Sequence, residues 1–194
     1  MFIELLTEPE SDKDMGQRWT RIIIDQGHFG LPSFRYLSIT AFLPEKAEYF
    51  GLYYARPQMM ALANMLEHPI IKSERMSTPF GGRKIKRSNK DLGRVLAIGY
   101  LEQRRGTLDF HKWAYDWSAA LQKCFPQDCK DLAIRAGSGL IQLLSSTEDL
   151  EEAHHTCVYG LLSSISVTMD DLNEVGERII GEAVEDLIKL SQKY

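Results

Sequence analysis

The sequence predicts an α+β fold, in which a small, mostly antiparallel N-terminal sheet precedes a helical half that ends in a long amphipathic helix. Two observations lead to this prediction. Before residue 55, runs of β-branched and aromatic residues are separated by short turns, which is typical of strands. From Pro57 onward, apolar residues recur at helical spacing. A sheet this small needs a helical layer over one face.

Four segments are predicted strands. They span residues 2–7, 19–25, 35–42 and 49–54. The second contains three consecutive isoleucines and is expected to break at the sequence QGHFG. Gly51 interrupts the fourth and is a candidate β-bulge. Because the gaps between these segments are of turn length, the strands are expected to pair with one another.

The helical pattern begins at Pro57, a residue that suits the first position of a helix ending near residue 68. Ser88 and Asp91 resemble a capping box that opens the next helix. Gly137 and Gly139 lie inside a helical pattern, where they permit close helix packing or a kink. Further helices are predicted over residues 110–123, 131–144, 148–162 and 169–192. The last has an apolar stripe made of Leu172, Val175, Ile179, Ala183, Leu187 and Leu190.

Composition places the chain among ordinary globular proteins. Hydrophobic residues make up 44% and charged residues 26% of its 194 residues, which excludes a disordered, collagen-like or fibrous protein. The sequence contains no apolar run of the ~18 residues that a membrane helix needs, and its acidic start is unlike a secretory signal. Three irregularly spaced cysteines favour reduced thiols, so we expect a cytoplasmic protein without membrane contacts.

Positive charge is concentrated between Lys72 and Arg105. This segment contains ten basic and only three acidic residues, although the net charge of the whole chain is −4. Three hypotheses explain this segment: a solvated surface, pairing with the acidic C-terminal region within the chain or across a dimer, or a phosphate or nucleic-acid surface. Gly81 and Gly82 would let backbone N–H groups approach a phosphate. The candidate phosphate-binding residues are Arg83, Lys84, Lys86, Arg87 and Lys90.

The sequence contains none of the common catalytic motifs, such as a Gly-x-Ser-x-Gly elbow, a His-Glu-x-x-His helix or a phosphate-binding Walker loop. His154 and Cys157 share one helix face, but two ligands do not make a metal site. Cys124 and Cys129 have no second pair to complete a zinc knuckle. We therefore expect neither a metal nor another cofactor.

The first hundred residues contain, in order, FIELLTE, LPSFRYLSITAF, YYARPQMMALANMLEHPIIKSER and KIKRSNKDLGRVLAIGYLEQ. This series resembles the later part of the minimal nucleotidyltransferase-like proteins associated with toxin–antitoxin systems. The resemblance implies a nucleotidyltransferase-like α+β portion over residues 1–105 and a helical portion packed on it over residues 106–194. It places Glu4 at the family's third acidic position and Lys90-Asp91 at its Lys-Asp position.

The chain lacks the family's Gly-Ser signature followed by two carboxylates one residue apart. Because two-metal chemistry needs those carboxylates together with the third, Glu4 is at most a vestigial catalytic residue. The predicted function is therefore that of a non-enzymatic binding or interaction protein, a catalytically incomplete relative of nucleotidyltransferases. The alternatives are a nucleotide- or nucleic-acid-handling enzyme that acts with a partner chain, and a structural homo-oligomer.

The C-terminal helix suggests how such an oligomer would form. Ile180, Val184 and Ile188 lie beside its main apolar stripe and widen the apolar face. A wide face usually packs on more than one neighbour. The sequence therefore predicts a homodimer through this helix.

Overall fold

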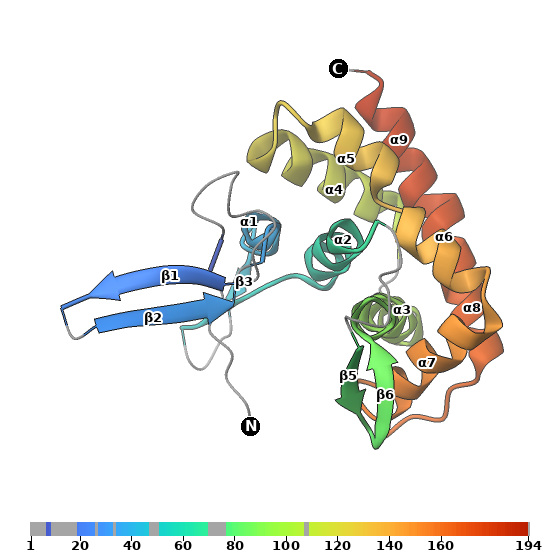
Figure 1. The fold of residues 1–194 in the computed structure, drawn as a ribbon. Coiled ribbons are helices and arrows are strands. Elements are labelled where there is room, and N and C mark those ends of the chain that lie inside the picture. Colours follow the sequence, from blue (N-terminus) through green and yellow to red (C-terminus); the bar gives the residue numbers. More distant parts are fainter. Residues whose placement is uncertain are drawn as a thin grey trace.

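The computed structural model describes residues 7–8, 19–25, 27–32, 34–46, 51–69, 77–106 and 109–193. It has the predicted α+β fold, in which helices dominate and a long helix ends the chain (Figure 1). The described strands pair only in twos, as three antiparallel ladders, rather than as one four-stranded sheet. Buried apolar side chains from before and after residue 105 form one shared core cluster.

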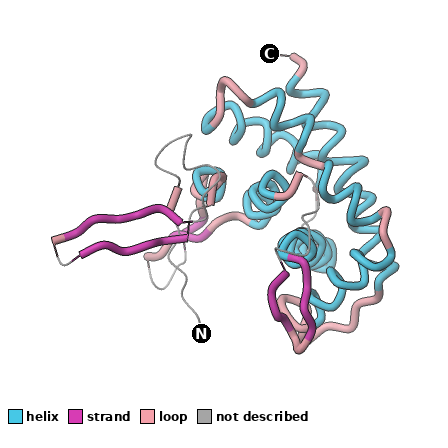
Figure 2. The backbone as a smooth tube through the Cα atoms, viewed as in Figure 1, coloured by secondary structure: helices cyan, strands magenta, loops and turns pink. Residues whose placement is uncertain are grey.

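The first ladder is a hairpin of β1 (Trp19–Ile24) and β2 (Gly27–Pro32), which reaches away from the helical body (Figures 1 and 2). β1 confirms the predicted strand. The sequence QGHFG was expected only to break that strand, but most of it forms the start of β2. Ile24 pairs with Gly27, so the chain reverses over the two residues between them.

The second ladder is smaller than predicted. It joins β3 (Glu45–Lys46) to β4 (Tyr53–Tyr54), which is the described strand within the segment 49–54. Of the predicted strand over residues 2–7, the structure describes only Thr7, whose carbonyl accepts a hydrogen bond from the backbone N–H of Phe34 at 2.9 Å.

The prediction of a strand over residues 35–42 is wrong, because this segment contains the short helix α1 (Leu37–Thr40). The Glu8 carboxylate accepts the backbone N–H of Ser38 in the first turn of this helix, at 2.5 Å. Ile39 is buried in the core. A cap supplied by a distant residue and the burial of one side chain therefore override the β propensity of the segment.

The third ladder, β5 (Ser77–Phe80) with β6 (Arg83–Lys86), lies in a polar stretch for which the sequence predicted no strand. Gly81 and Gly82 form its turn with φ values of +56° and +79°. Such positive values at both central residues are typical of tight hairpin turns, and glycine adopts them without strain.

The predicted helices are confirmed with small shifts of their ends, and one is divided. Their bounds are α2 (Pro57–Glu67), α3 (Arg87–Arg105), α4 (Phe110–Cys124), α5 (Cys129–Arg135), α6 (Ser138–Leu144), α7 (Thr147–Val158), α8 (Met169–Arg178), the π-helical η3 (Ile179–Val184) and α9 (Glu185–Ser191). The helix predicted over residues 131–144 is divided between α5 and α6. A Cβ atom at Gly139 would overlap the carbonyl oxygen of His68, and one at Gly137 would lie 2.9 Å from Val184 Cγ1. Both glycines thus permit close packing, as the sequence predicted.

The C-terminal helix runs through α8, η3 and α9 and packs along several helices of its own chain (Figure 1). The predicted stripe is buried from Leu172 to Leu187. The residues that motivated the homodimer also contribute to this packing: Val184 is buried, and Ile180 and Ile188 are half-buried against the core. The wide apolar face is thus largely covered within the protomer, and the homodimer through this helix stays a prediction.

Candidate functional site

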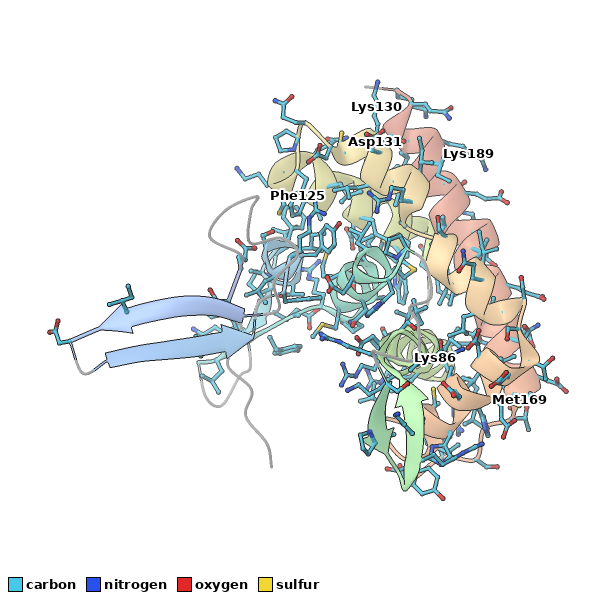
Figure 3. The ribbon with its side chains drawn as sticks, viewed as in Figure 1. Lys86, Phe125, Lys130, Asp131, Met169 and Lys189 are labelled. Atoms are coloured by element: carbon cyan, nitrogen blue, oxygen red, sulfur yellow. The ribbon has the colours of Figure 1, made fainter. Side chains whose placement is uncertain are left out.

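The five basic candidates lie where β6 runs into α3, and Lys86, labelled in Figure 3, marks the junction. The backbone N–H of Lys86 donates to Glu152 Oε2 of α7 at 3.1 Å, so a carboxylate 66 residues away caps α3. The predicted capping box of Ser88 and Asp91 is wrong. Both residues lie within the helix and are buried, and the N-cap Lys86 makes no capping bond with its own side chain.

Two of the basic candidates bind acidic residues of α7. Lys86 Nζ donates to Asp149 Oδ1 at 2.7 Å, and Arg83 lies 3.2 Å from Glu151 Oε1. The buried amide of Asn89 donates to both Asp149 and Glu152. For Arg83 and Lys86 the structure therefore shows pairing within the chain, one of the three hypotheses for this segment.

The Lys86–Asp149 pair perturbs both groups. The hydrogen bond to Asp149 raises the pKa of Lys86 despite the opposing effect of burial. Burial alone would raise the pKa of Asp149, but the hydrogen bonds from Lys86 and Asn89 outweigh burial and lower it. Both side chains are therefore charged at neutral pH, so this lysine is neutralised by a fixed partner.

Arg87 belongs to a second cluster, centred on the buried carboxylate of Asp91. His68 Nε2 lies 2.8 Å from Asp91 Oδ2, and Arg94 donates to Oδ1 at 3.0 Å. Arg87 Nε donates to Oδ2 at 3.4 Å. Burial would raise the pKa of Asp91, but the interactions with His68 and the two arginines lower it. Among the described residues, His68 Nδ1 has no hydrogen-bond partner.

Lys84 and Lys90 differ from the other candidates because neither forms an ion pair with any described residue. Lys84 is exposed and Lys90 is half-buried. Lys90 lies on the same stripe of α3 as Arg87 and Arg94, and Asp91 is the acidic residue among them. Positive charge therefore exceeds negative charge along this part of α3.

The remaining chemical candidates have structural partners or lie outside the described residues. Glu4 belongs to the residues that the structure does not describe. His154 Nε2 bonds the carbonyl oxygen of Val167 at 2.9 Å. Cys157 is buried, and burial raises the pKa of its thiol to about 12. Over the described ranges, no three metal-ligating side chains gather at one place.

One apolar surface was not identified in the sequence. Leu52, Tyr53 and Tyr54 are consecutive and exposed, at 66%, 66% and 50%. Leu43, which precedes β3, is also exposed, and the Tyr54 hydroxyl bonds Glu45 Oε2 at 2.7 Å. We call residues 52–54 the 52–54 surface. A run of exposed apolar residues is unusual without a binding role, so the sequence GLYY itself could have pointed to it.

No protein-family model, curated protein or solved structure matches this chain. The resemblance to nucleotidyltransferase-like proteins therefore stays a prediction. Among the described helices, none combines the length and the apolar character needed to cross a membrane.

Proposed function

We propose that this protein is a non-enzymatic, cytoplasmic interaction protein that binds a protein partner through the 52–54 surface. The observation that carries this proposal is the exposure of three consecutive large apolar residues, the last two of which form β4 and pair with β3. Tyrosine side chains combine a large apolar area with a polar tip, and they are enriched among residues that dominate binding energy. The hydrogen bond from Tyr54 to Glu45 fixes one of these rings before a partner arrives.

The pairing of the basic candidates supports the same proposal. Arg83 and Lys86 attach the β5–β6 hairpin to α7, and Arg87 binds the buried Asp91. These three cations already have carboxylate partners within the chain, so they are less available to an external phosphate. The chain also lacks the Gly-Ser signature and the two carboxylates that follow it in nucleotidyltransferases, which favours a protein without nucleotidyltransferase activity.

Two variants test the binding surface. Leu52→Ser/Tyr53→Ser removes its centre, while Tyr115→Ser/Ile134→Ser removes a comparable exposed apolar area from α4 and α5. Each tagged protein is incubated with extract of its source cells, and the retained proteins are identified. We expect a partner that is lost with the first variant and kept with the second. Equal retention by both variants would contradict the proposal.

A separate assay tests the absence of enzymatic activity. Wild-type protein and Glu4→Gln are incubated with nucleoside triphosphates, Mg²⁺ and protein or RNA acceptors. We expect no nucleotide transfer by either protein. A robust transfer that Glu4→Gln abolishes would establish the alternative, an enzyme.

Nucleic acid or nucleotide binding is the second candidate, favoured by the excess positive charge along α3. Lys84→Gln/Lys90→Gln removes two ammonium groups without breaking an ion pair between described residues. Binding to single-stranded RNA by the α3 surface should fall steeply as salt rises and should weaken in this variant. Lys112→Gln/Lys123→Gln, at two exposed positions of α4, is the control with the same charge change away from α3. Binding that is insensitive to salt, or equal in both variants, argues against this surface.

A further inference from the structure

The turn of the β5–β6 hairpin rests on two stacked rings at the C-terminal end of α7. The imidazole of His155 stacks on the ring of Tyr159, with the ring centroids 4.4 Å apart. A Cβ atom at Gly81 would lie 2.6 Å from His155 Cε1 and 3.1 Å from Tyr159 Cγ, so a larger residue would displace a ring. The backbone of the turn therefore packs directly on His155.

The hairpin is attached to the helices more firmly at its base than at its tip (Figure 1). At the base, Ile85 is buried and Lys86 binds carboxylates of α7. At the tip, the turn rests on His155, and Arg83 pairs with Glu151 although both side chains are about half exposed, at 51% and 54%. Loss of the tip contacts would therefore release the turn while the base stays in place.

His155 is the titratable group in the contact between the turn and α7. Its Nδ1 is buried and has no hydrogen-bond partner among the described residues, and it lies 3.4 Å from the position of a Cβ atom at Gly81. A neutral imidazole accommodates this environment, because one of its nitrogens carries no proton. The imidazolium carries a proton on both nitrogens, so protonation places a donor without an acceptor inside the contact.

The charged groups around this ring act in both directions. Arg83 of β6 and His154 of α7 oppose a positive charge on His155, whereas Glu151 of α7 favours it. Tyr159 contributes its stacked ring, and the residues of β5 have no ionisable side chain. Burial has the largest effect, and the pKa of His155 is lowered from 6.5. The closed hairpin therefore opposes protonation of the ring, and by linkage protonation opposes the closed hairpin.

We propose that the β5–β6 hairpin is an acid-released arm, whose turn separates from α7 when His155 is protonated. The imidazolium repels Arg83 and gives Glu151 a cationic neighbour four residues along its own helix, the spacing of helical ion pairs. Arg83 then leaves Glu151, and the turn loses the ring contact and the ion pair together. The freed Arg83 adds a positive charge without a carboxylate partner to the exposed start of β6. Acid thus changes both the position of the arm and the charge that it presents.

Two-dimensional NMR of the full chain between about pH 7.5 and 5 tests the arm. In wild type, we expect a nuclear Overhauser contact between the Cε1 proton of His155 and the α-protons of Gly81 in the neutral form. This contact should be lost as the ring titrates, and the amide signals of Gly81 and Gly82 should shift with the same midpoint. A contact that persists when the ring is protonated, or that is missing when the ring is neutral, overturns the proposal.

Two histidine variants identify the group responsible. His155→Gln keeps a polar side chain that takes up no proton, and its turn should stay closed down to about pH 5. His111→Gln is the matched control, because it removes a titrating histidine that binds Asp186 instead, and its turn should open as in wild type.

The proposal is wrong if the glycine signals of His155→Gln shift with acid as they do in wild type. The wild-type titration decides the question if this variant fails to fold. Because the hairpin does not include the 52–54 surface, neither result depends on the partner-retention experiment.

Discussion

The imidazole of His68 is completely buried at the end of α2 and lies 2.8 Å, from Nε2 to Oδ2, from the carboxylate of Asp91 in α3. This contact joins the two helices through buried polar atoms. Arg87 and Arg94 bind the same carboxylate from its more exposed side. Asp91 thus connects the core to the basic stripe of α3.

Removal of this carboxylate should destabilise the fold. Asp91→Ala leaves the buried His68 without its partner and removes the acidic residue shared by two arginines. We expect a loss of about 3–5 kcal/mol in the free energy of unfolding, measured with urea. Asp131→Ala, at an exposed position of α5, should cost less than about 1 kcal/mol. A small effect of Asp91→Ala would show that the contact contributes little.

Lys86 should behave as a structural residue. Lys86→Met breaks the ion pair with Asp149 and leaves a largely buried carboxylate with fewer partners. We expect a loss of about 1–3 kcal/mol in the free energy of unfolding. Lys84→Met, two residues earlier and exposed, should change it by no more than about 0.5 kcal/mol. Equal stability of both variants would mean that Lys86 is available for another role.

Two glycine substitutions should have opposite effects. Gly139→Ala places a methyl group against the carbonyl oxygen of His68, and we expect a loss of about 1–3 kcal/mol or more. A Cβ atom at Gly181 would meet nothing within 4 Å, so Gly181→Ala should raise stability by up to about 1 kcal/mol. Thermal unfolding followed by circular dichroism measures both changes. Stabilisation by Gly139→Ala would contradict the close approach of α6 to the end of α2.

The ring of His155 should make stability depend on pH. Burial, with the nearby charges of Arg83 and His154, lowers its pKa from 6.5, although Glu151 acts in the opposite direction. The unfolded chain therefore binds the proton more readily than the folded chain. The neutral ring contributes to the stability of the fold above about pH 6.5, and this contribution is lost as the pH falls through the lowered pKa. Wild type should lose more stability between about pH 7.5 and 5 than His155→Phe.

His111 provides the opposite trend. The hydrogen bond to Asp186 raises the pKa of His111. The contribution of this pair to stability is therefore present at low pH and lost as the pH rises through the raised pKa. The comparison of wild type with His155→Phe cancels this effect, because both proteins keep His111. Identical pH profiles of the two proteins would show that His155 does not influence stability.

Periodicity in the sequence was sufficient for the long helices but not for features that depend on distant residues. α2, α4 and the C-terminal helix follow directly from apolar spacing and from Pro57. α1 could not be predicted in this way, because its first turn is bonded by Glu8 from 30 residues earlier. The β5–β6 hairpin did have a local signal, since two glycines between short strands are typical of a tight turn.

The candidate site was predictable only in part. The basic segment is visible in the sequence, but its ion pairs with α7 join residues more than 60 positions apart. His68 carries no sign of its role, because a single histidine is as often exposed as buried and its partner Asp91 lies 23 positions away. Glu4 lies outside the described residues, so the nucleotide-transfer assay, rather than the structure, tests its predicted role.

The cap that Glu152 provides to α3 has a consequence for synthesis on the ribosome. When residues 1–105 have emerged, the amide of Lys86 and the side chain of Asn89 still lack their acceptors, and the face of α3 that packs on α7 and α8 is uncovered. We therefore expect the nascent chain to stay incompletely folded until α7 has left the exit tunnel. Residues before 105 would then complete their packing only after the helices that follow them have been made.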